Sequence, residues 1–193
     1  MTQSFLFAAS MALALTAMPS SGAVIYNETI NGDLSGAFAS PTPLVLAVGG
    51  NTIIARIGNN GNTGATNGSD ADYFTVTLGT GESLVSMTLD SYTFSPSNPG
   101  VSFAGYIPAA AFAGQAGGNI AGSSLFNASS GNLLVDFTGS STPLGAGAYS
   151  FWFQETSANI VSYQLTLNVV PEPSSALLGA CGVSLFIAPR RRR

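Results

Sequence analysis

The sequence is first informative for what it lacks. It has no histidine and no lysine, a single cysteine (Cys181), and one arginine, Arg56, outside the C-terminal run at 190–193. Without histidine, zinc, haem and Ser-His-Asp sites that depend on it are excluded. A lone cysteine forms neither an internal disulfide nor a CxxC redox pair. Without a basic patch in the body of the chain, no nucleic acid is expected as a partner.

Charge is scarce and mostly negative. Charged residues make up 7% of the 193 residues, against about 25% in an ordinary soluble domain. Between Val24 and Val169 there are eight carboxylates and one arginine, which gives a net charge of about −7. This charge favours solubility and association with cations, and it disfavours acidic partners. The segment 24–169 is long enough for one domain with a core.

The N-terminal segment has the features of an export signal. An apolar run at 5–17 is followed by small residues, and Ser21 and Ala23 fit the small-x-small rule for signal peptidase, with cleavage between Ala23 and Val24. The run is shorter than the roughly 20 residues that span a bilayer. We therefore expect residues 1–23 to be a signal peptide, and the alternative of a buried helix is disfavoured because the run has no polar face.

The C-terminal segment, residues 170–193, has three parts. Pro171, Glu172 and Pro173 break the preceding strand, an apolar stretch follows at 176–188, and Arg190, Arg191, Arg192 and Arg193 close the chain. The arginines are expected to stay on the cytoplasmic side of a membrane. A plain tail anchor is the alternative, but the 13 apolar residues are fewer than the roughly 17 of a stable span.

These three parts, in this order, resemble the PEP-CTERM protein-sorting signal of Gram-negative bacteria. The resemblance implies that an inner-membrane exosortase processes the chain near Pro171-Glu172-Pro173 after a transient stay in the inner membrane. The body is then expected at the cell surface or in the extracellular polymer matrix, without Cys181. The chain would be the substrate of a processing enzyme and not itself an enzyme.

The body of the chain shows the period-two alternation of β-strands. Phe74, Val76 and Leu78 share one face of an expected strand. In the strand expected at 149–154, the side chain of Trp152 is on the face opposite to that of its two neighbours in sequence. The pattern predicts an all-β, antiparallel, jelly-roll-like β-sandwich of about eight or nine strands, flanked by an N-terminal signal helix and a C-terminal hydrophobic helix. Strands are expected at 24–29, 44–48, 52–57, 72–78, 83–89, 101–107, 133–137, 149–154 and 162–169, with 72–78 and 83–89 forming the clearest hairpin.

Part of the body also resembles bacterial pre-peptidase C-terminal domains. The similarity is carried by Ser69 to Leu78 with Gly81 to Leu84, and by Gly147 to Phe151 with Tyr163 to Leu167. It implies a non-catalytic β-sandwich of the kind that accompanies secreted hydrolases, some of which bind calcium or polymeric substrates. Here no catalytic domain accompanies the module.

One group of polar and acidic side chains could hold a metal ion. Asn59, Asn60, Asn62, Asn67, Asp70 and Asp72 lie in or beside a Gly/Asn-rich loop. Calcium takes six to eight oxygen ligands, which such a loop can supply, and Asp70 and Asp72 are spaced to share one side of a strand. The alternative is an ordinary turn, because Asn, Asp and Gly favour turns by their backbone preferences. Apart from this possible calcium, no cofactor is expected.

A glycosidase and a sugar-stacking surface are two further functional classes. A glycosidase needs two carboxyl groups in proximity, and no spacing in the sequence pairs any two of Glu28, Glu82, Asp90, Asp136 and Glu155. Trp152 is either part of a second core or an exposed residue that stacks on sugar rings. The sequence thus favours a non-enzymatic surface or matrix protein associated with exopolysaccharide, with a calcium-dependent carbohydrate-binding module as the alternative.

Overall fold

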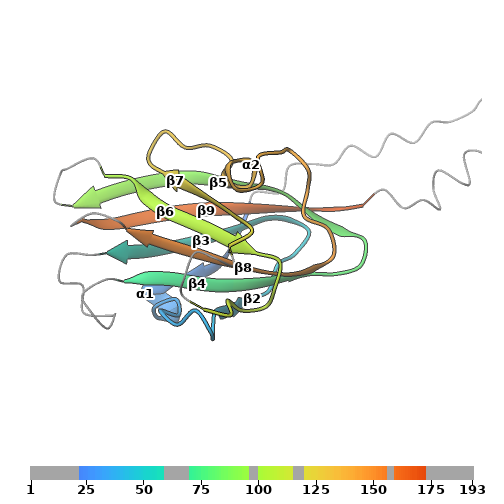
Figure 1. The fold of residues 1–193 in the computed structure, drawn as a ribbon, viewed down its shortest axis with the longest axis horizontal. Coiled ribbons are helices and arrows are strands. Elements are labelled where there is room, and N and C mark those ends of the chain that lie inside the picture. Colours follow the sequence, from blue (N-terminus) through green and yellow to red (C-terminus); the bar gives the residue numbers. More distant parts are fainter. Residues whose placement is uncertain (1–21, 59–69, 96–99, 115–119, 156–158, 173–193) are drawn as a thin grey trace, which may run out of the picture.

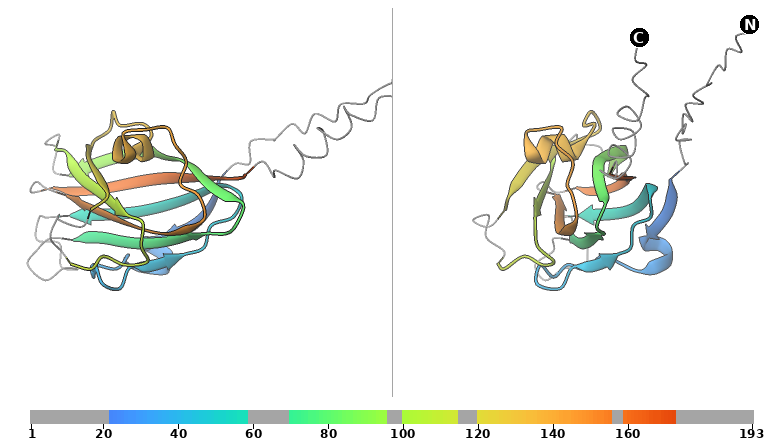
Figure 2. Two further views of the ribbon diagram at one scale, coloured as in Figure 1. Left: turned by 45° about the vertical axis from the view of Figure 1, so that its right-hand side comes forward. Right: turned by 90° about the vertical axis from the view of Figure 1, so that its right-hand side faces the viewer.

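The structure is a computed structural model that describes residues 22–58, 70–95, 100–114, 120–155 and 159–172. In this part of the chain, two β-sheets pack face to face and enclose one main core (Figures 1 and 2). The predicted all-β sandwich is confirmed. The two predicted flanking helices lie outside the described residues, and no helix among the described residues is long and apolar enough to cross a membrane.

The first sheet contains four strands in the order β1-β3-β9-β5, and the second contains five in the order β2-β4-β8-β6-β7. The strands of the first sheet are β1 (Ala23–Asn27), β3 (Gly49–Gly58), β9 (Ile160–Pro171) and β5 (Glu82–Ser95). Those of the second are β2 (Thr42–Leu44), β4 (Ala71–Leu78), β8 (Gly147–Glu155), β6 (Ser102–Ile107) and β7 (Gly122–Phe126). Two short helices accompany them, α1 (Glu28–Asn31) and α2 (Leu133–Thr138).

The core follows the alternation read from the sequence. On β4, Phe74, Val76 and Leu78 are buried between the sheets, where Phe74 stacks on Phe151 and Phe153 of β8. From the facing sheet, β9 contributes Tyr163, Leu165, Leu167 and Val169, all at most 1% exposed. Each such side chain contributes about 1.5–3 kcal/mol by leaving water, so these two central strands hold the sheets together.

A β-bulge in β5 changes which residues face the core. The register against β9 shifts between Leu84 and Ser86, and Leu84 is fully buried together with Met87 and Leu89, whereas Val85 is only half-buried. Strict alternation would align Val85 with Met87 and Leu89. The extra residue of a bulge moves the side chains before it to the opposite face.

The predicted hairpin of 72–78 with 83–89 is wrong. β4 pairs with β2 and β8, while β5 pairs with β9 in the other sheet. The turn at 79–82 therefore carries the chain from one sheet to the other. Nor is every pair antiparallel, since β1 runs parallel to β3 and β2 runs parallel to β4. Period-two alternation identifies a strand and its faces but not the partner strand.

Three other elements differ from prediction. The strand expected at 44–48 is β2, which ends at Leu44 and leaves Val45 87% exposed. The strand expected at 133–137 is the helix α2, with Asn132 accepting the Leu134 N–H as N-cap and left-handed Gly139 as C-cap. Leu133, Leu134 and Phe137 then face the core on one side of the helix. Finally, β7 is a strand that is not among those predicted from alternation.

Candidate metal centre

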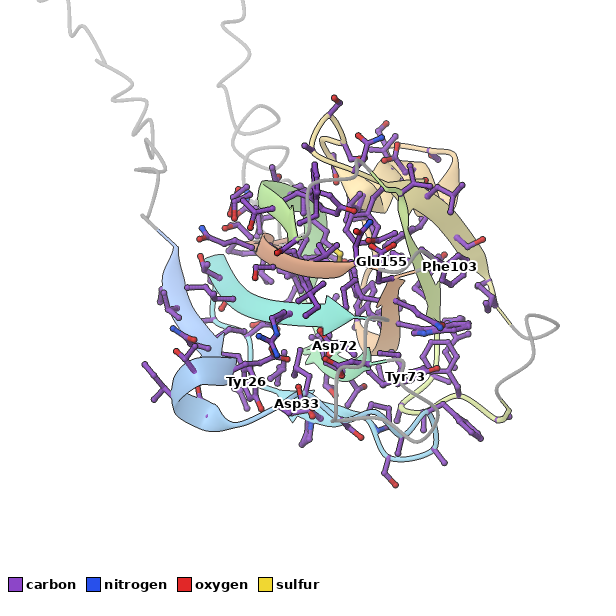
Figure 3. The ribbon with its side chains drawn as sticks, turned by 90° about the vertical axis from the view of Figure 1, so that its left-hand side faces the viewer. Tyr26, Asp33, Asp72, Tyr73, Phe103 and Glu155 are labelled. Atoms are coloured by element: carbon purple, nitrogen blue, oxygen red, sulfur yellow. The ribbon has the colours of Figure 1, made fainter. Side chains whose placement is uncertain are left out.

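Three carboxylates from two distant parts of the chain meet at one end of the sandwich. Single oxygens of Glu28, Asp33 and Asp72 lie within 4.8 Å of one another. Figure 3 views this end of the molecule and shows Asp33 and Asp72 there, with Tyr26 on the adjoining β1 segment. Glu28 is half-buried, Asp33 is exposed and Asp72 is fully buried. The cluster therefore runs from solvent into the protein interior.

Glu28 is held by main-chain donors. It is the first residue of α1, a single turn that begins where Asn27 accepts the Thr29 N–H. The two Glu28 oxygens accept hydrogen bonds from different backbone amides, Oε1 from Leu34 at 3.1 Å and Oε2 from Arg56 at 2.7 Å. This carboxylate thus joins the N-terminal segment to β3, and each oxygen keeps lone-pair capacity for another partner.

Asp33 is positioned by the turn that follows α1. Gly32 has a φ of 90°, a conformation that glycine adopts without strain. The Tyr26 hydroxyl donates to the Gly32 carbonyl at 3.0 Å, which ties this turn back to β1. Leu34, the next residue along, is buried at 1% exposure in the main core. Asp33 is therefore anchored on both sides, while its side chain remains in contact with water.

Asp72 is the most deeply buried member. It lies on β4 with no exposed surface, and its Oδ2 accepts a 2.6 Å hydrogen bond from the hydroxyl of Tyr163 on β9, across the sandwich. Its other oxygen, Oδ1, has no hydrogen-bond partner among the described residues. A buried carboxylate oxygen without a donor is costly, and such groups in native proteins require a physical explanation.

Burial raises the pKa of three carboxyl groups in this region, those of Glu28, Asp70 and Asp72. Loss of water raises the pKa of Glu28 to about 7, although the Leu34 and Arg56 amides oppose the shift, and it raises the pKa of Asp70 to about 6. The pKa of Asp72 lies well above its ordinary value, mainly through burial and then through the nearby charge of Glu28. These carboxyl groups therefore hold their protons more strongly than exposed carboxyl groups do.

The predicted calcium residues are only partly brought together. Asp72 belongs to the cluster, while Asp70 lies beside it, 5% exposed, and raises the pKa of both Glu28 and Asp72. Asn59, Asn60, Asn62 and Asn67 lie outside the described residues. Sequence reasoning missed Glu28 and Asp33, because a separation of some forty residues from Asp72 gives no local spacing signal. The Asn27 N-cap and Gly32 mark only the local turn.

The predicted sorting motif begins where the sandwich ends. Pro171 is the last residue of β9 and pairs with Glu82, and the backbone N–H of Glu172 donates to the Gly81 carbonyl at 2.7 Å. The Ser83 hydroxyl donates to the Glu172 carboxylate at 2.8 Å. Pro173 and Arg190–Arg193 lie outside the described residues. Of the predicted signal-peptidase site, Ala23 and Val24 are the first two residues of β1, and both are exposed.

Trp152 belongs to a second, smaller cluster on the outer face of the five-stranded sheet. Its indole stacks on Tyr73 with 5.6 Å between ring centroids, and Phe103 and Phe112 contact it edge-on. Half-buried Trp152 thus takes part in a second core, and the predicted alternative of an exposed sugar-stacking residue is not favoured. Figure 3 shows Tyr73 and Phe103 together on this side of the sheet.

The acids considered for a glycosidase include one member of the cluster, Glu28. Its neighbours, however, are Asp33 and Asp72, which were not among those candidates. A general acid must come within hydrogen-bond distance of the scissile oxygen, but Asp72 has no exposed surface through which a polymeric substrate could reach it. The geometry fits a small cation better than a polymeric substrate.

A second buried carboxylate lies at the same end but in different surroundings. Glu155, the last residue of β8, has no exposed surface, and its Oε2 accepts a 2.6 Å hydrogen bond from the Ser102 hydroxyl. The Ser102 hydroxyl is also within 3.0 Å of the Tyr92 hydroxyl. These three side chains link β5, β6 and β8 and form a hydroxyl network.

Comparison of the chain with protein-family models, with curated proteins and with solved structures finds no match.

Proposed function

We propose that this protein is exported, sorted by an exosortase and displayed as a non-enzymatic β-sandwich at the cell surface or in the exopolysaccharide matrix of a Gram-negative bacterium. The observation that carries the proposal is the three-part C-terminal segment, Pro171-Glu172-Pro173, an apolar stretch and four arginines. Its partners would be signal peptidase and exosortase during processing, the inner membrane transiently, and matrix polymers or proteins afterwards.

The placement of the domain ends supports this proposal. Ala23 on β1 pairs with Asn51, and Asn51 pairs with Leu167 near the end of β9, so β1 starts at the end of the sandwich where β9 finishes. The acidic cluster lies at the opposite end, where β4 begins, as Figure 1 shows by the positions of α1 and β4. A domain held by its C-terminal tail would present the acidic end away from the membrane.

The sorting proposal is tested by replacing Pro171, Glu172 and Pro173 with alanine in a host that has the exosortase. We expect a longer, membrane-retained form of the protein, because the processing enzyme loses its motif. Release of a product of wild-type size would contradict the proposal.

Because Glu172 also contacts Ser83, a matched control is needed. Ser83→Ala removes the 2.8 Å hydrogen bond to Glu172 but leaves the motif intact, so it should be sorted normally. Retention of Ser83→Ala to the same extent would show that the alanine replacements act through the stability of the fold.

The alternative function, a calcium-dependent carbohydrate-binding module, is supported by one observation, the cluster of Glu28, Asp33 and Asp72. It is tested by cosedimentation of the exported protein with the host exopolysaccharide in calcium and in EDTA. Retention that EDTA abolishes would support this function. Absence of retention in both buffers would leave the protein as a structural or protein-binding matrix component.

A further inference from the structure

The feature that carries an inference beyond sorting is the unpartnered oxygen of Asp72. Asp72 is fully buried, Tyr163 satisfies its Oδ2, and Oδ1 has no hydrogen-bond partner in the part of the chain that the structure describes. This carboxylate belongs to the group whose oxygens converge with those of Glu28 and Asp33. A ligand at the cluster would offer this buried carboxylate the further partner that it lacks.

The spacing fits a single ion. Oxygens bound to Ca²⁺ lie 2.3–2.6 Å from it, so two ligands on opposite sides of the ion are about 4.6–5.2 Å apart. The oxygens of Glu28, Asp33 and Asp72 all lie within 4.8 Å of one another. The three carboxylates are therefore close enough together to share one ion, and exposed Asp33 provides its contact with solvent.

The ligand chemistry selects a hard cation. The cluster offers only oxygen atoms, and the chain has no histidine and no cysteine in its body, which disfavours zinc and copper. Magnesium requires near-ideal octahedral geometry and dehydrates reluctantly, whereas calcium accepts irregular sets of carboxylate, carbonyl and water oxygens. A partly buried set of three carboxylates from a helix, a turn and a strand is of the irregular kind.

We propose that Glu28, Asp33 and Asp72 form a calcium site that fastens the N-terminal segment, residues 24–34, to the sandwich. The ion joins α1 and the turn after it, which follow β1 of the four-stranded sheet, to β4 of the five-stranded sheet. This segment is otherwise attached through parallel pairing of β1 with β3, burial of Leu34 and the hydrogen bonds of Glu28. Calcium thus stabilises the fold where the ion is abundant, outside the cytoplasm.

Other charged and titratable groups around the site affect its affinity. Asp70 adds negative charge beside Asp72, and Arg56 on β3 opposes it. The Tyr26 and Tyr163 hydroxyls stay protonated, since burial and the neighbouring carboxylates raise their pKa. Calcium and protons compete for the same carboxylate oxygens, so binding should weaken at acid pH.

The test is calcium titration of the purified full chain, followed by calorimetry and by thermal unfolding in calcium and in EDTA. We expect one ion per chain, with a dissociation constant of about 10⁻⁴–10⁻³ M as in extracellular modules, and a melting temperature that rises with calcium. Asp33→Asn is the best variant, because this side chain is exposed and its loss leaves the core intact. It should weaken calcium binding at least tenfold.

Asp136→Asn is the matched control, since Asp136 is an exposed acid on α2 outside the cluster. It should bind calcium as the wild type does. Equal weakening in both variants, or no calcium-dependent change in the wild type, would overturn the proposal.

Terbium luminescence provides a readout that does not depend on any variant. Tb³⁺ substitutes for calcium and is excited by nearby tyrosines, and Tyr163 is hydrogen-bonded to Asp72. We expect sensitised emission that calcium suppresses by competition, and its absence would also contradict the site. These experiments do not involve the exosortase, so their failure is separate from failure of the sorting proposal.

Discussion

Two fully buried carboxylates, Asp72 and Glu155, lie at the same end of this sandwich, and they differ in what surrounds them. Each accepts a 2.6 Å hydrogen bond from a hydroxyl group, Asp72 from Tyr163 and Glu155 from Ser102. Asp72, however, has two further carboxylates within reach of its oxygen and one oxygen without a donor. Glu155 lies in a network of hydroxyls that extends to Tyr92.

The difference shows that burial of an acid does not by itself indicate a ligand site. A carboxylate whose neighbours are hydroxyl donors is stabilised by those donors, and it ties strands together. A carboxylate whose neighbours are other acids is destabilised by them and needs a proton or a cation. On these grounds Glu155 is a structural residue, and Asp72 is a ligand of the proposed calcium site.

The largest expected effect comes from Glu155→Ala. The substitution opens a cavity and leaves the buried Ser102 hydroxyl without its acceptor, so it should lower the free energy of unfolding by about 2–4 kcal/mol. The loss should be the same in calcium and in EDTA, as measured by urea denaturation. A loss that depends on calcium would remove the distinction between the two carboxylates.

Asp72→Asn is expected to have a smaller and conditional effect. In EDTA the change should be slight, because burial raises the pKa of Asp72 and so disfavours its charged form, and because asparagine can still accept from Tyr163. In calcium the variant should lack the stabilisation by bound ion, which is about 1.4 kcal/mol at ten times the dissociation constant. Equal loss in both buffers would assign Asp72 the same structural role as Glu155.

The smallest expected effect is the pH dependence of the calcium-free protein. The pKa of Glu28 is raised to about 7 and that of Asp70 to about 6, so between pH 4.5 and 7 the folded state holds more protons than the unfolded state. Stability should therefore fall as pH rises through this window and level off above it. Since both groups are partly screened by water, the change in melting temperature should be modest.

Calcium is expected to reduce this decline, because it replaces the lost protons at the cluster. The measurement is a series of thermal melts from pH 4 to pH 8 in EDTA and in calcium. Melting temperatures that rise across this window in EDTA would contradict the assignment of raised pKa values to these carboxyl groups.

Much of the fold could be predicted from local pattern. The buried faces of β4, β8 and β9 follow alternation, because a strand places successive side chains on opposite faces. The helix α2 also had local signals that alternation obscured, namely the Asn132 cap, the Gly139 cap and apolar residues at 133, 134 and 137. The pairing of β4 with β8 instead of β5 had no such signal, since strand pairing depends on contacts between segments distant in sequence.

By itself the sequence determined the fold class, the faces of the main strands and the three-part segment on which the sorting proposal rests, because these features depend on residue type and short-range spacing. Only the tertiary structure decided that Glu28 and Asp33 meet Asp72. That meeting requires the parallel placement of β1 beside β3 and of β2 beside β4, which brings the N-terminal segment to the end of the sandwich where β4 begins. Local spacing cannot encode a contact that depends on how two sheets are assembled.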